Sequence, residues 1–98
     1  MSDHVHLIAR LVPRQGQETA LAQAVAAIVP AVLGEPGCLA YTAHESRERA
    51  GTIVMVESWE SQATLDAHAD GVNFRALAAR FDELLAEPLA IETLRRIT

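Results

Sequence analysis

The stretch GTIVMVESWESQATLDAHADGVNFRAL, residues 51–77, decides the fold of this chain. Its first part, residues 52–60, has the period-2 alternation of a strand. Ser61 is a good N-cap for a helix that Gly71 ends, and Asn73 caps a second helix. The stretch therefore predicts a strand followed by two short helices. One strand face carries Ile53, Met55, Glu57 and Trp59, and the other carries Val54, Val56 and Ser58.

Three side chains with useful chemistry lie close together in this stretch. The carboxylate of Glu57 and the indole of Trp59 stand at the strand end, and the imidazole of His68 follows on the first helix. Spacing of three and four residues puts His68 on the same helix side as Leu65 and Val72. We therefore expect His68 to face the sheet, with the rest of the chain closing over this corner.

The chain before this stretch reads as strand, helix and strand. Residues 4–12 alternate, with an apolar face at positions 5, 7, 9 and 11. From Gln17 the apolar period becomes helical, and Pro30 predicts a kink or a helix that ends at Val29. Residues 38–47 alternate again, and the short polar segment 48–51 predicts a hairpin to the next strand.

The second of these helices continues beyond the stretch, and a last strand follows it. An apolar stripe runs from Phe74 to Leu85, Pro88 breaks it, and residues 89–97 alternate. The order β-α-β-β-α-α-β is typical of the α+β ferredoxin-like split β-α-β fold, a four-stranded antiparallel sheet with helices on one face. The other sheet face is too apolar to stay wet, so we predict a homodimer that packs sheet to sheet.

Length and composition limit the classes of function. The 98 residues predict one domain, 1–98, and a net charge of −5 argues against a nucleic-acid partner. No apolar run is long enough to span a bilayer, so we expect no membrane association. The single cysteine, Cys38, has no internal partner for a disulfide, which fits a cytoplasmic location.

The chain resembles a known family along essentially its whole length. The resemblance rests on three motifs in order: EPGCLAY at residues 35–41, VESW at 56–59 and LDAH at 65–68. They are similar to the antibiotic biosynthesis monooxygenase superfamily, most closely its small bacterial quinol-monooxygenase-like branch. The resemblance implies a dimeric α/β barrel that adds one oxygen atom from O2 to a quinol or electron-rich aromatic, without metal, flavin or haem.

The chain also departs from patterns found in that superfamily. Polyketide-tailoring members use an asparagine and a tyrosine where this chain has Met55 and Leu65, and Arg80 is the candidate for their arginine. Haem-degrading relatives need residues that this chain replaces, which argues against haem degradation; the replaced positions are Ile8, His68 and Leu77. Because the branch also contains an isomerase of a phosphorylated sugar, membership alone does not settle the reaction.

His68 is the candidate catalytic base, because imidazole exchanges protons near neutral pH. The alternative is a core histidine bonded to a carbonyl. Glu57 needs a partner on its apolar face. It could contact substrate or orient His68, while an ion pair with Arg10 or Arg75 is the favoured interpretation.

The remaining candidates for substrate contact are aromatic. Tyr41 could donate a hydrogen bond to a substrate oxygen, and Phe74 would complete the apolar wall. Trp59 is expected either to stack on substrate or to pack in the core. His4, His6 and His44 lack zinc spacing, so no metal site is predicted, and Cys38 is expected to be a buried thiol.

The leading hypothesis is a cofactor-independent monooxygenase with a small aromatic or quinol substrate and O2. A second hypothesis is an isomerase or proton-transfer enzyme on a small phosphorylated substrate, which would need arginines in the pocket. A third is a non-catalytic dimer that binds a small molecule in a pocket without inward-facing polar groups.

Overall fold

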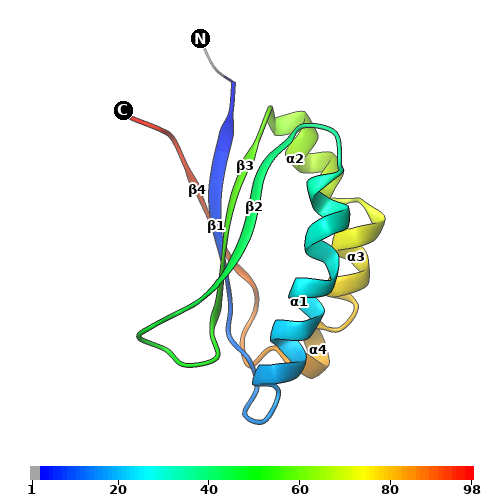
Figure 1. The fold of residues 1–98 in the computed structure, drawn as a ribbon, viewed down its shortest axis with the longest axis vertical. Coiled ribbons are helices and arrows are strands. Elements are labelled where there is room, and N and C mark those ends of the chain that lie inside the picture. Colours follow the sequence, from blue (N-terminus) through cyan, green and yellow to red (C-terminus); the bar gives the residue numbers. More distant parts are fainter. Residues whose placement is uncertain (1–2) are drawn as a thin grey trace.

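The computed structural model describes residues 3–98 and contains one four-stranded antiparallel sheet with helices against it (Figure 1). The strands lie in the order β2-β3-β1-β4. In chain order the elements are β1 (Val5–Leu11), α1 (Glu18–Leu33), β2 (Cys38–Glu45), β3 (Ile53–Trp59), α2 (Gln62–Ala69), α3 (Val72–Ala78), α4 (Phe81–Leu84) and β4 (Ala90–Leu94).

The register of the sheet follows from its hydrophobic alternation. Strands β2 and β3 form the predicted hairpin, and β1 pairs with β3 from Val5 opposite Trp59 to Leu11 opposite Ile53. This register puts the alternate apolar residues of β1 and β3 on one inner face. That face and the helices form the buried core, which includes Leu7, Leu11, Leu21, Val25, Val32, Met55, Trp59, Leu77 and Leu84.

All four helices lie on the same side of the sheet, as Figure 1 shows. This arrangement confirms the α+β ferredoxin-like fold that the element order predicts. Helix α1 packs along β2 and against α3, while α2 returns over the end of β3. The short turn between β3 and α2 therefore brings the start of α2 directly over the strand end that carries Glu57 and Trp59.

The outer face of the sheet has no cover within the described residues 3–98. Val56 at its centre is 42% exposed and Leu94 on the edge strand is 43% exposed. Strand β3 is internal to the sheet, and in the single chain its helix-side face is buried while its outer face is not. A second copy remains our prediction for the missing cover.

Helix α1 does not end at Val29, one of the two outcomes expected at Pro30, because it continues to Leu33 and is capped by Gly34. Proline removes a helix donor and leaves the carbonyl of Ala26 without its usual partner. Both Ala26 and Pro30 are exposed, so solvent can hydrate that carbonyl at small cost.

The predicted helix of residues 73–85 is divided in two. Helix α3 ends at Ala78 and α4 begins at Phe81. The chain then leaves helical geometry at Leu85, which forms an isolated bridge with Pro13. Strand β4 is also shorter than the predicted residues 89–97.

Candidate functional site

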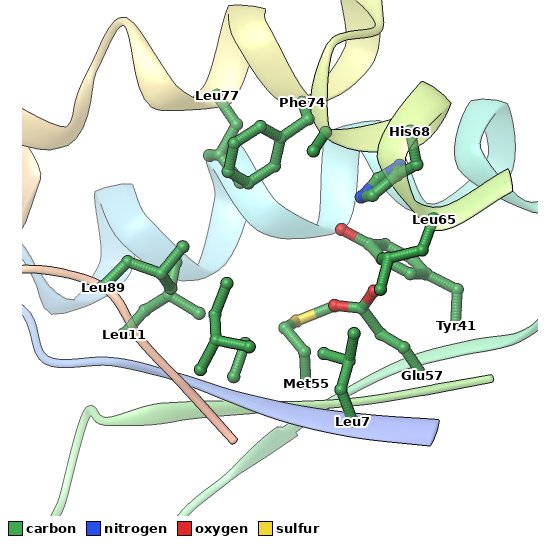
Figure 2. Close-up of a pocket in the computed structure, with 13 residues that line it drawn as sticks. Leu7, Leu11, Tyr41, Met55, Glu57, Leu65, His68, Phe74, Leu77 and Leu89 are labelled. Carbon is green, nitrogen blue, oxygen red and sulfur yellow. The ribbon is translucent and has the colours of Figure 1, made fainter. Parts of the chain in front are cut away.

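A small cavity lies between the inner face of the sheet and helices α2 and α3 (Figure 2). Its volume is about 60 Å³. Most of its wall is apolar, formed by Leu7, Ala9, Leu11, Met55, Leu65, Ala69, Phe74, Leu77, Leu89 and Ile91. Ile91 lies on the edge strand β4 and is 57% exposed, so the cavity approaches the surface there.

Three polar side chains meet at the end of the cavity away from Leu89 and Leu11. They are Tyr41 from β2, Glu57 from β3 and His68 from α2, all of which line the cavity. Figure 2 shows the imidazole reaching down from the helix and the carboxylate reaching up from the sheet. The site is thus a mostly apolar cavity with acid–base groups at its inner end.

Helix α2 fixes the position of His68. Ser61 and Thr64 form a capping box at its start, so the helix begins at a defined residue directly after β3. Two turns later, His68 is 5% exposed. Its ring stacks on Trp59 with centroids 4.6 Å apart, and Tyr41 and Phe74 approach it at 5.5 and 5.7 Å. The imidazole is therefore held on three sides by aromatic rings.

The carboxylate partner of His68 is Glu35, in the loop between α1 and β2. The Nδ1 atom of His68 lies 2.9 Å from Oε1 of Glu35, and Asn73 donates from Nδ2 to Oε2 at 2.8 Å. An ionised carboxylate only accepts, so Nδ1 carries the hydrogen and donates it. That tautomer leaves the lone pair on Nε2, as a general base requires.

Sequence reasoning missed Glu35 because it lies in the loop segment Glu35-Pro36-Gly37, where no periodicity indicates the direction of a side chain. Its partner His68 is 33 positions away in the sequence. The available signal was chemical: an acidic residue in a turn motif that the family resemblance already singled out. Glu57, which was considered for orienting His68, does not bond to it.

Glu57 accepts a hydrogen bond from the indole Nε1 of Trp59 at 3.0 Å. The expected ion pair with Arg10 or Arg75 is therefore wrong: both arginines are exposed, whereas Glu57 is buried with its oxygens toward the cavity and the indole. Burial raises the pKa of Glu57 above its ordinary value, while the indole N–H and the nearby His68 oppose that rise. The carboxyl is thus held by a neutral donor.

Burial, and then the charge of Glu57, raise the pKa of the Tyr41 hydroxyl well above its ordinary range. Tyr41 therefore keeps its proton and can donate it in a hydrogen bond. It lines the cavity and is 3% exposed.

Two of the polar atoms at this end have no hydrogen-bond partner among residues 3–98. Within the described residues, every side-chain nitrogen or oxygen that is fully shielded from solvent has a hydrogen-bond partner. Neither Tyr41 Oη nor His68 Nε2 bonds to another of residues 3–98, so both must remain accessible from the cavity. These atoms could bind a hydroxyl group that enters along the apolar walls.

Of the other expected site residues, Phe74 lines the cavity, whereas Trp59 and Arg80 do not. Phe74 lines the cavity, as expected of a substrate-contacting residue. Trp59 does not line it: the side chain is fully buried behind His68 and serves Glu57 as donor. Arg80 pairs with Glu83 at the surface, 2.9 Å away, and offers the cavity no charge.

Two of the histidines considered for a metal have other hydrogen-bond partners. His6 bonds to Ser58 Oγ at 2.7 Å and His44 to Thr42 Oγ1 at 2.9 Å. Within residues 3–98, no group of three or more metal-ligating side chains is gathered. None of the helices in that range has both the length and the apolar character to cross a membrane.

Comparisons with known proteins agree with this architecture. The model of a family described as antibiotic biosynthesis monooxygenase matches residues 4–80. A protein named putative monooxygenase Rv0793, from Mycobacterium tuberculosis, is 32% identical over 94 residues, covering 96% of this chain and 92% of that protein. Its solved structure has a TM-score of 0.90 at 30% identity over 97% of this chain and 96% of that one.

Two further solved structures have the same fold. PA3566 from Pseudomonas aeruginosa has a TM-score of 0.92 at 30% identity, covering 100% of this chain and 98% of its own. A Nitrosomonas europaea protein, described as a putative antibiotic biosynthesis monooxygenase, has a TM-score of 0.89 at 15% identity over 96% and 90% of the two chains. At that identity the second likeness shows the fold alone.

Proposed function

The chain belongs to the antibiotic biosynthesis monooxygenase family, and from that premise we propose that it oxidises a hydroquinone or another electron-rich phenol with O2, without a cofactor. The observation that carries the proposal is the inner end of the cavity. There His68 Nε2 and Tyr41 Oη are accessible and unpaired beside Glu57, at the end of an otherwise apolar wall.

The side chains fit the first step of such a reaction. A phenol whose hydroxyl reaches the inner end would give its proton to Nε2 of His68, and Tyr41 would donate a hydrogen bond to the resulting oxyanion. Glu35 stabilises the imidazolium from the other side of the ring. The apolar walls keep water away from the anion, which then loses its electrons more readily to O2.

The oxygen step balances without an added reductant. The phenolate passes one electron to O2, and the resulting phenoxyl radical and superoxide join at a ring carbon. The peroxide takes a proton, its O–O bond breaks as the ring C–H proton leaves, and one oxygen atom departs in water. A hydroquinone thereby becomes a hydroxyquinone, and the substrate itself supplies all four electrons that reduce O2.

The size of the cavity limits the substrate. Its volume of about 60 Å³ is smaller than the ~150 Å³ apolar cavity that accommodates benzene. A single ring would therefore require outward movement of exposed side chains such as Ile91 at the β4 edge. Fused ring systems would require far more, so we propose single-ring substrates.

The test is oxygen uptake with substituted hydroquinones, compared with their autoxidation in buffer. Wild-type protein should exceed the autoxidation rate, and His68→Ala should lose about 100-fold or more of the excess, the usual contribution of a general base. His44→Ala is the matched control, because His44 is exposed and bonds only to Thr42. If wild type and His68→Ala both match autoxidation, the oxygenase proposal is wrong.

The rival hypotheses find less support at this cavity. A phosphorylated substrate would need cations, yet no arginine lines the cavity and the charged groups near it are acidic. A non-catalytic binding site would need a wall without inward polar groups, whereas three are present. Turnover under anaerobic conditions would favour the proton-transfer enzyme.

The proposal includes a cytoplasmic location, where Cys38 stays a free thiol.

A further inference from the structure

His68 forms the wall between two different spaces. On one side it lines the cavity beneath the helices. On the other side it lines a groove on the molecular surface, together with Glu35, Thr64, Ala67 and Asn73. The imidazole is thus the thin partition between the buried site and solvent on the face of α2.

The two ring nitrogens serve these two spaces separately. Nδ1 donates to Oε1 of Glu35 at 2.9 Å, on the groove side. Nε2 has no partner among residues 3–98 and is the nitrogen left for the cavity. Glu35 is 17% exposed where His68 is 5% exposed, so the carboxylate, unlike the imidazole, is partly open to the groove.

We propose that Glu35 relays protons between His68 and solvent through this groove, on the side of the ring opposite the substrate cavity. The proposal rests on the proposed function, because it needs a phenol that gives its proton to Nε2. A ring bound in the cavity would cover Nε2, which leaves Nδ1 and Glu35 as the open path. Asn73 is a positioning residue, since its amide holds the second oxygen of Glu35 at 2.8 Å.

The relay closes a proton cycle without rotation of the imidazole. Nε2 takes the phenol proton, and Nδ1 passes its own proton to Glu35, which releases it to solvent in the groove. Nε2 later gives its proton to the peroxide, and Nδ1 regains one from solvent through Glu35. No net proton is gained or lost, and His68 returns to the tautomer in which it began.

The experiment separates proton removal from proton release, and it needs no oxygen chemistry. Wild-type protein is mixed anaerobically with 4-nitrophenol in weakly buffered solution that contains a pH indicator. The rise in nitrophenolate absorbance above that of the same solution without protein reports the proton taken by His68, and the matching rise in the indicator signal reports the proton that reaches solvent. In wild type both signals should rise together.

Glu35→Gln should still form nitrophenolate, while release to the indicator slows at least about 10-fold, because an amide cannot carry the proton onward. Glu48→Gln, an exposed glutamate in the β2–β3 loop, is the matched control and should behave as wild type. In Glu35→Ala, added formate should restore fast release, because a small acid can enter the groove. A purely structural role for Glu35 would not give that rescue.

The outcomes distinguish the two proposals. If Glu35→Gln releases the proton as fast as wild type, the relay is wrong and His68 can remain the base. The relay is equally refuted if formate fails to speed release in Glu35→Ala. If wild type forms no more nitrophenolate than the same solution without protein, both the base and the relay are overturned.

Discussion

At the scale of single residues, Glu57 is a buried carboxyl whose environment opposes its charge. It is 6% exposed and has one hydrogen-bond donor, the indole of Trp59. Its pKa is raised chiefly by burial, so the ionised form is less stable in the folded chain than in the unfolded one. Glu57 therefore lowers the free energy of unfolding at pH values where its carboxyl is ionised in the folded chain.

The sign of the pH dependence follows from linkage. Between pH 4.5, the ordinary pKa of a glutamate, and its raised folded pKa, the folded chain holds more of this proton than the unfolded chain. Because the folded state binds more protons, the stability contributed by protonated Glu57 is lost as pH rises through that window. Above the pKa of Glu57 in the folded chain, the full loss of stability is present. Below its pKa in the unfolded chain, there is no loss.

Glu57→Gln should therefore raise the melting temperature at pH 7. The amide is neutral, and its carbonyl oxygen can still accept the Trp59 hydrogen bond. The advantage over wild type should shrink as pH falls toward 4.5, which thermal denaturation at several pH values would measure. Glu60→Gln, at an exposed position beside the same strand end, should show no such trend. A constant or negative difference would contradict the assigned cause.

The sequence could predict those site residues that lie on regular elements. His68 follows from its helical spacing with Leu65, and Tyr41 and Glu57 from strand alternation. Glu35 could not be found in this way, because a loop residue has no periodicity that indicates its direction. The Trp59–Glu57 bond was missed for a related reason: period 2 puts both residues on one face but does not say that they bond.

At the scale of elements, the turn before β2 holds the sheet against α2. Gly37 has a φ of +78°, and a Cβ there would lie 2.5 Å from Cγ2 of Thr64, a member of the helix cap. Its carbonyl also accepts from the backbone N–H of Glu60 at 2.8 Å. The close approach of backbone to helix therefore requires glycine on two separate grounds, conformation and space.

Gly37→Ala and Gly16→Ala separate these two grounds. Gly16 has a φ of +88° with nothing within 4 Å of a Cβ, so its substitution costs only the positive-φ penalty of about 1–2 kcal/mol. Gly37→Ala pays the same penalty and must also displace Thr64, which adds about 1–3 kcal/mol. Urea denaturation of the two variants measures the difference. Equal losses would mean that Thr64 moves aside freely.

The elements also show where local patterns stop being informative. Pro30 predicts a kink or a helix that ends at Val29, but α1 continues to Leu33, with Ala26 and Pro30 both exposed. The apolar stripe from Phe74 to Leu85 predicts one helix, yet α3 ends at Ala78 and α4 begins at Phe81. In both cases the local pattern locates the helical segment but not its bounds.

At the scale of the whole molecule, the outer face of the sheet is the surface that we expect a second copy to cover. Its central positions are Ile8 on β1 with Val54 and Val56 on β3, and Ile8 lies directly opposite Val56. Polar pairs such as His6 with Ser58 border them. A partly apolar centre with a polar border is the usual anatomy of an interface, and a stable one buries about 800 Å² per partner.

Light scattering at micromolar concentration should therefore give about twice the 10.6 kDa mass of one chain. Val56→Asp should return the mass to that of a monomer, because pairing would bury two unpaired carboxylates where the sheets meet. Val72→Asp is the matched control: Val72 is 79% exposed on α3, on the helical side, and its change should leave the dimer intact. A monomeric wild type, or a dimer that survives Val56→Asp, would show that something other than a second sheet covers this face.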